Sequence, residues 1–199
     1  MVLNIYQESN LKTNDCQFGY IKEHSPVIAA FTVEETIIYH LNNETEVYAC
    51  FLDASKAFDC VDHTKLFLKL LDRGLPVVIA RFYFYVYSNI FARVCWNGHF
   101  SHWFIFKIGV LQGGVLSPVF FIVYIDSFYD VLKGSGYGCR IGHVFLGLFG
   151  YADDHALLSP TLTGLLHMIS AISGEAKKLN TNINPSKSKY TKFYRGRFK

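Results

Sequence analysis

The chain has 199 residues, of which 51% are hydrophobic and 17% aromatic, so it can bury a sizeable core and wholesale disorder is disfavoured. Its formal net charge of +3 is compatible with a nucleic-acid partner but is too small to indicate one. The 5 cysteines form no CxxC pair, which argues against a disulfide framework and a zinc knuckle and favours buried free thiols in a reducing, intracellular compartment.

The first fifth of the chain predicts two helices with a loop between them. Residues 2–11 have a weak amphipathic pattern that predicts a short helix, and their polar interruptions argue against a signal peptide. A loop follows through residues 24–26, and residues 31–41 carry apolar side chains at helical spacing. Thr32 and Glu35 would form a capping box for this second helix, which we expect to end at residues 42–43.

A buried strand and two helices are predicted next. The continuous apolar run over residues 47–52 is typical of a strand central in a sheet, and it places Asp53 at the strand's carboxyl end. Asp62 is suited to cap a helix that runs to Leu71, and a further helix is expected over residues 76–88. This region is strongly apolar, but Arg81 and the polar residues after it argue against a membrane span.

The Asn97-Gly98 pair between two runs of β-forming residues predicts a hairpin with a tight type I′ turn. We expect the aromatic residues over 100–106 to belong to the core rather than to a base-stacking platform. A glycine-bearing loop then leads into an apolar helix from Ser117 to Leu132. The rest of the chain predicts a linker over 134–142, strands over 145–151 and 155–158, a helix over 162–179, and a loop or strand over 184–193.

Asp153 and Asp154 lie between two of these predicted strands. Adjacent carboxylates among apolar runs are unfavourable to bury unless a positive partner neutralises them. No Lys or Arg occurs between Arg140 and Lys177, and carboxylate oxygens favour Mg²⁺ or Mn²⁺ over zinc. A solvated Asp-Asp turn at a hairpin tip is the commoner fate of such a pair, so the pair alone leaves both interpretations open.

Three further segments carry side chains suited to a nucleotide. In the first, Asp53, Lys56 and Phe58 could supply a metal ligand, a phosphate contact and a wall against a sugar. The second combines glycines, which let a backbone approach a ligand, with the amide of Gln112. The third is a basic turn. Taken singly, each is better explained as a satisfied loop, an ordinary helix start or a solvated turn. The segments are FLDASKAFD at 51–59, GVLQGGVLSP at 109–118 and NPSKSK at 184–189.

Together and in this order, the three segments and the YADD sequence at 151–154 resemble the palm motifs of reverse transcriptases, most closely those of non-LTR retrotransposons. The sequence QFGY at residues 17–20 also resembles a segment of the family's fingers. The resemblance implies an α+β fold, the polymerase palm, with a ferredoxin-like or RRM-like antiparallel sheet backed by helices. It further implies a partial fingers segment at residues 1–46, a palm at residues 47–199 and no thumb.

The activity that the resemblance implies is RNA-directed DNA polymerisation, in which a primer 3′-hydroxyl receives a nucleotide from a dNTP with Mg²⁺ or Mn²⁺ as cofactor. The implied partners are an RNA template, a DNA primer and a dNTP, and a membrane is not among them. Asp53, Asp153 and Asp154 would be the catalytic metal ligands.

Other residues of the motifs would contact the substrates, again by resemblance. Phe58 would be the steric gate that excludes a 2′-hydroxyl. Gln112 and Gly113 would line the pocket for the incoming nucleotide and the template. Lys56 would lie near the triphosphate and Lys187 near the pyrophosphate. The alternative interpretation is a truncated, catalytically inactive retroelement remnant with at most weak nucleic-acid binding.

Some positions have a different or a purely structural expectation. His155 stands where the family usually has an apolar residue, so it would either perturb the metal site or pack as a neutral core histidine. Asp59 and Asp62 would be structural residues that hold a loop and cap a helix.

Overall fold

The computed structural model describes residues 13–196, which form two compact units. The smaller unit comprises residues 58–124, and the larger one comprises residues 13–57 together with the chain from residue 125 onward. The helix predicted over residues 2–11 lies outside the described residues. The predicted boundary between fingers and palm at residue 46 stays a prediction.

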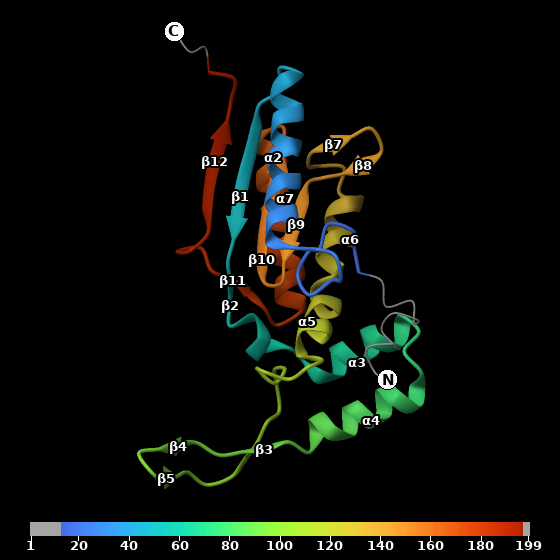
Figure 1. The fold of residues 1–199 in the computed structure, drawn as a ribbon, viewed down its shortest axis with the longest axis vertical. Coiled ribbons are helices and arrows are strands. Elements are labelled where there is room, and N and C mark those ends of the chain that lie inside the picture. The colour runs from blue at the N-terminus through green and yellow to red at the C-terminus, as the bar shows by residue number, and fades with distance from the viewer. Residues whose placement is uncertain (1–12, 197–199) are drawn as a thin grey trace. The chain divides into compact units, whose positions relative to one another are not determined.

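A four-stranded antiparallel sheet, in the order β12-β1-β10-β9, forms the centre of the larger unit (Figure 1). Strand β1 pairs with β10 on one side and with β12 on the other, so the predicted central strand is confirmed. Its apolar run explains this position, because a strand with neighbours on both sides is largely shielded from water. The strands are β1 (Val47–Leu52), β9 (Leu148–Tyr151), β10 (Asp154–Ser159) and β12 (Lys189–Phe193).

Helix α2 (Pro26–Asn42) lies across one face of this sheet and helix α7 (Leu162–Lys178) lies across the other (Figure 1). Leu165, Met168 and Ile172 recur at helical spacing along α7 and are fully buried, which makes them the apolar stripe that the helix presents to the core. A short antiparallel pair joins β2 (Ala54–Ser55) to β11 (Asn182–Ile183) beside the sheet.

The predicted start of α2 at residue 31 is wrong. The helix begins at Pro26, and the side chain of Ser25 caps it by accepting a hydrogen bond from the Ile28 nitrogen at 3.2 Å. Proline suits the first helical position because its missing N–H would have had no partner there. Thr32 forms no capping box, since its hydroxyl donates to the Ile28 carbonyl oxygen within the helix at 2.8 Å.

The single helix predicted from Ser117 to Leu132 is two helices, α5 (Ser117–Ile125) and α6 (Ser127–Gly134). They are divided at Asp126, a residue type that helix interiors disfavour, and its carboxylate accepts a hydrogen bond from the Asn14 nitrogen at 3.0 Å.

The predicted linker and strand between α6 and the acidic turn are also partly wrong. A short hairpin of β7 (Arg140–Ile141) and β8 (Val144–Phe145) occupies this region, and β9 starts only at Leu148. Gly147 allows the chain to fold back here, because a Cβ on it would lie 2.6 Å from the Phe145 ring.

The smaller unit contains helices, a hairpin and a glycine-bearing loop. Its first helix is capped by Asp62, whose carboxylate accepts from the Lys65 nitrogen at 3.0 Å, as predicted. The aromatic rings of Phe67, Tyr87 and Phe120 pack edge to face and hold its helices together. The elements are η1 (Ala57–Cys60), α3 (His63–Asp72), α4 (Val77–Ser88), β3 (Phe91–Ala92), β4 (Cys95–Trp96), β5 (His99–Phe100), β6 (Phe104–Ile105) and α5.

The expectation of buried free thiols has a mixed outcome. All the cysteines are free, but only Cys16, Cys50 and Cys139 are buried, whereas Cys95 is exposed. Among the helices of the described chain, none combines the length and hydropathy that a bilayer crossing requires.

Candidate active site

Acidic residues meet at the carboxyl end of β1. The last pair of the β1–β10 register is Leu52 with His155, so Asp53 and Asp154, which adjoin this pair, lie at the same end of the sheet. Asp153 belongs to the tight turn that joins β9 to β10, where Asp154 pairs with Tyr151. The strand end and the acidic turn, far apart in the sequence, are therefore neighbours.

The charges of these residues interact. Partial burial raises the pKa of the Asp154 carboxyl above its ordinary value, and the negative charges of Asp153 and Asp53 raise this pKa further. A positive ion shared among the carboxylates would relieve both effects.

One carboxylate oxygen of Asp53 accepts no hydrogen bond from the part of the chain that the structure describes. This oxygen, Oδ2, is buried. The Nζ of Lys187 lies 3.7 Å away and forms an ion pair, but this lysine is mostly exposed, so the pair contributes little. The Asn184 nitrogen donates to the Asp53 carbonyl oxygen at 2.8 Å, which ties the basic turn to the end of β1.

The donor chemistry at this end of the sheet fits a hard divalent cation. Carboxylate oxygens are the ligands that Mg²⁺ prefers, and the unsatisfied oxygen of Asp53 is available to one. Across residues 13–196, however, no three His, Cys, Asp or Glu side chains are arranged as a ready metal-binding group.

Gln17 holds the acidic turn, and sequence reasoning gave it no such role. Its buried Oε1 accepts hydrogen bonds from the Ala152 nitrogen at 3.2 Å and from the Gly19 nitrogen at 2.9 Å. Ala152 has a φ of +57°, a left-handed conformation that is unfavourable for alanine unless its surroundings impose it. Gly19 packs directly on this turn, because a Cβ on it would overlap the Ala152 nitrogen.

His155 secures the other side of the turn. Burial lowers the pKa of this histidine to about 4, so the ring is neutral at neutral pH. Its Nδ1 lies 2.9 Å from the Asp153 carbonyl oxygen, which can only accept, so Nδ1 carries the proton and donates. The ring also packs against Phe128 with centroids 5.6 Å apart. Of the two alternatives for His155, the neutral core histidine is confirmed.

The remaining candidate residues belong to two different units. Lys56 is an exposed residue of the larger unit with a φ of +49°. Phe58, Gln112 and Gly113 belong to the smaller unit, where the Val110 nitrogen donates to the Phe58 carbonyl oxygen at 2.8 Å and so joins the two motifs.

Within the smaller unit, the ring of Phe58 is half-buried and stacks on Phe121 with centroids 4.3 Å apart. Gln112 and Gly113 are exposed, and the Gln112 amide donates to the Asp59 carboxylate at 3.2 Å. The structural role predicted for Asp59, that of holding a loop, is therefore confirmed.

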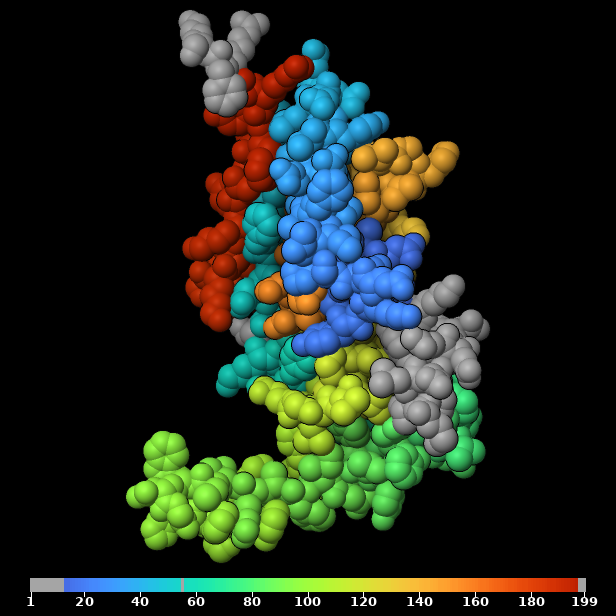
Figure 2. Space-filling view, in the orientation of Figure 1, coloured from blue at the N-terminus to red at the C-terminus, as the bar shows by residue number. Residues whose placement is uncertain are grey.

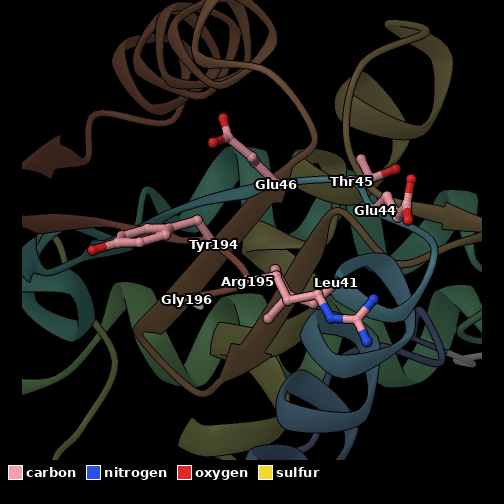
Figure 3. A pocket seen from close by; sticks show the side chains of 7 residues that line it. All are labelled: Leu41, Glu44, Thr45, Glu46, Tyr194, Arg195 and Gly196. Atoms are coloured by element: carbon pink, nitrogen blue, oxygen red, sulfur yellow. The ribbon is translucent and has the colours of Figure 1, made fainter. Parts of the chain in front are cut away.

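Hollows lie along the sheet of the larger unit, and the positions of two of them bear on the candidate site. One, of about 330 Å³, is lined by residues of α2, β1, β9 and β10, most of them apolar, and reaches Tyr151 and Asp154 beside the acidic turn. The other, of about 500 Å³, has Glu44, Glu46 and Arg195 among its walls (Figure 3). Since Glu46 precedes β1 and Asp53 follows it, this second hollow lies at the far end of the strand and is not part of the candidate site.

Comparison with known proteins gives relatives and fold neighbours. A family model described as reverse transcriptase (RNA-dependent DNA polymerase) matches residues 5–195. Over 141 residues the chain is 30% identical to the Retrovirus-related Pol polyprotein from type-1 retrotransposable element R2 of Nasonia vitripennis, a match that covers 71% of the chain and 14% of the relative. Over 183 residues it is 27% identical to the probable RNA-directed DNA polymerase from transposon BS of Drosophila melanogaster, with 87% and 19% covered. The chain thus spans less than a fifth of the length of either relative.

Among solved structures, the chain is similar to apo telomerase of Candida tropicalis truncated from the C-terminal domain, with a TM-score of 0.72 and 14% identity over 98% of this chain and 39% of that one. It is also similar to telomerase of Candida albicans in complex with a TWJ fragment of telomeric RNA, with a TM-score of 0.62 and 16% identity over 84% of this chain and 31% of that one. At these identities the likeness concerns the fold alone, and it agrees with the predicted α+β fold of the palm type.

Proposed function

Because the chain belongs to the reverse transcriptase family, with non-LTR retrotransposon proteins among its relatives, we propose that it is the part of an RNA-directed DNA polymerase that carries the catalytic carboxylates. The observation that supports the proposal is the β1–β10 register, which ends with Leu52 paired to His155 and so brings Asp53 to the same end of the sheet as the Asp153-Asp154 turn. Residues 13–46 would belong to the fingers of this polymerase and the chain from residue 47 onward to its palm.

In this proposal Asp53, Asp153 and Asp154 hold the divalent cations, Mg²⁺ or Mn²⁺. Their oxygens suit such ions, and the unsatisfied Oδ2 of Asp53 supports their presence among the ligands. Bound divalent cations in sites of this kind lower the pKa of an attacking hydroxyl and neutralise the charge that develops on a transferred phosphate.

The residues around the carboxylates would keep them in position. Gln17 and His155 hydrogen-bond to the backbone of the acidic turn from two sides, so its carboxylates would move little when a substrate binds. Lys187 forms an ion pair with Asp53, and its exposed amine would be free to turn towards the phosphates of a nucleotide.

Residues of the segments at 51–59 and 109–118 would select the substrate. The ring of Phe58, whose orientation is held by its stacking on Phe121, would lie against the sugar of a dNTP and exclude a 2′-hydroxyl. Gln112 and Gly113, on an exposed loop, would contact the incoming nucleotide and the RNA template. Lys56, which is also exposed, would contact the triphosphate.

Primer extension by the purified chain tests this proposal. The substrates are an RNA template, an annealed DNA primer and dNTPs, with Mg²⁺ or Mn²⁺. We expect extension that EDTA abolishes and that Asp153→Asn reduces by several orders of magnitude. Asp130 is an exposed residue of α6, and the control variant Asp130→Asn should leave extension unchanged. Absence of extension from a chain shown to be folded by circular dichroism would contradict the proposal and favour an inactive remnant.

A further inference from the structure

A hairpin of the smaller unit carries an unusual set of side chains. It runs from Phe91 to Ile105 and contains both tryptophans of the protein, Trp96 and Trp103. It lies within a stretch of chain, from residue 73 to residue 125, that has no acidic residue. The hairpin therefore combines aromatic rings with positive charge and offers no carboxylate to a partner.

The fold of the hairpin is well defined. Asn97 and Gly98 have φ values of +48° and +80°, as the predicted type I′ turn requires. Cys95 pairs with Phe100, whereas Ala92 pairs with Phe104, so the second strand has one residue more than the first between the two pairings. Such an extra residue bends a strand and redirects its side chains, and Trp103 lies in this bend.

The aromatic side chains of the hairpin are exposed, contrary to the expectation that residues 100–106 belong to the core. Trp96 is 80% exposed and Trp103 is 62% exposed. Phe91, Phe100 and Phe104 are exposed as well. In Figure 2 the hairpin, in light green, stands out from α4 as an arm with its side chains on the surface. Large rings left in water on a short hairpin indicate a binding surface rather than a core.

The hairpin also presents a stacked cation. The guanidinium carbon of Arg93 lies 3.8 Å from the centre of the Phe100 ring and 4.7 Å from that of Trp103. A guanidinium plane and aromatic rings are the groups on which unpaired nucleobases stack, and the arginine also attracts the phosphates between the bases.

We propose that the hairpin from Phe91 to Ile105 binds an unpaired nucleic-acid strand. The bases stack on Trp96 and Trp103, and Arg93 contacts the phosphates. A second copy of the chain fits the surface less well, because a symmetric contact between two hairpins would bring two positively charged surfaces together with no carboxylate on either hairpin to neutralise them. The inference rests on the proposed function in one respect, which is that a polymerase copying RNA must hold a template strand that is not yet paired.

The tryptophans themselves supply the assay, because intrinsic tryptophan fluorescence reports on this hairpin alone. The chain is titrated with single-stranded RNA and DNA oligonucleotides of mixed sequence, in EDTA and without dNTP. We expect saturable quenching that weakens steeply as the salt concentration rises. A blunt duplex of the same sequence should quench much less, because its bases are not available for stacking.

Variants identify the surface, with binding followed by the anisotropy of a labelled oligonucleotide. Trp96→Ala and Trp103→Ala should each weaken binding roughly tenfold, as expected for the loss of one stacked base. Arg93→Lys keeps the charge but loses the planar stack and should weaken it less. Tyr190→Ala, which removes an exposed ring of β12, is the matched control and should bind like the wild type.

The contrary results are equally specific. No quenching, or equal affinity of the wild type and both tryptophan variants, would overturn the inference. Concentration-dependent sedimentation that Trp96→Ala abolishes would also overturn it and would assign the hairpin to a contact between copies. The titration contains neither a divalent metal ion nor a dNTP. Its result therefore does not depend on whether the chain extends a primer.

Discussion

The contact of Gly19 with the acidic turn gives a sharp prediction for stability. A Cβ on Gly19 would overlap the Ala152 nitrogen and would lie 3.0 Å from the Ala152 Cα and 3.1 Å from the Tyr151 carbonyl carbon. These are backbone atoms, which cannot turn aside as the end of a flexible side chain can. Overpacking typically costs about 1–3 kcal/mol, so we expect Gly19→Ala to lower the free energy of unfolding by about 3 kcal/mol, at the upper end of this range.

Urea unfolding of the wild type and two variants measures this effect. The matched control is Gly174→Ala, because Gly174 lies within α7 and a Cβ on it would meet no heavy atom within 4 Å among the residues that the structure describes. Alanine in a helix is more favourable than glycine, so this control should gain about 0.5–1 kcal/mol. Gly19→Ala with the stability of the wild type, or a loss of the same size in Gly174→Ala, would refute the reasoning.

Three further predictions concern other parts of the chain. Burial raises the pKa of the Cys139 thiol from 9.0 to about 12, so as the pH rises above 9 the unfolded chain releases this proton first and stability falls. Cys139→Ala should remove a slope of roughly 1.4 kcal/mol per pH unit from the alkaline unfolding profile, and a parallel profile would contradict this. Asp62→Ala, which removes the N-cap of α3, should lower the free energy of unfolding by about 1 kcal/mol, and no change in urea midpoint would refute it. Phe58→Val should raise the use of ribonucleotides relative to deoxyribonucleotides in primer extension, and an unchanged ratio would remove the gate assignment.

Local signals in the sequence predicted the elements that carry the carboxylates. An apolar run that ends in an aspartate predicted β1 with Asp53 at its end, and the acidic pair between two apolar runs predicted a turn between strands. The cap at Asp62 and the turn at Asn97-Gly98 were likewise readable, because each depends on residues within one turn of chain.

Local sequence signals could not predict the interactions that hold the acidic turn in place. The hydrogen bond from the Ala152 nitrogen to Gln17 joins residues 135 positions apart, and no local pattern marks such a pair. The same limit explains the division of α5 from α6, where an interaction of Asp126 with Asn14 accompanies the break. The aromatic residues over 100–106 were assigned to the core because hydrophobicity does not distinguish a buried ring from one that serves a partner.

We propose above that Asp53 and the Asp153-Asp154 turn hold a divalent cation together. Titration of the chain with Mn²⁺, with free Mn²⁺ followed by electron paramagnetic resonance, tests this claim most directly. We predict saturable binding that Mg²⁺ competes away, that Asp53→Asn abolishes and that Asp130→Asn retains. Equal binding by the two variants, or no saturable binding by the wild type, would contradict the claim.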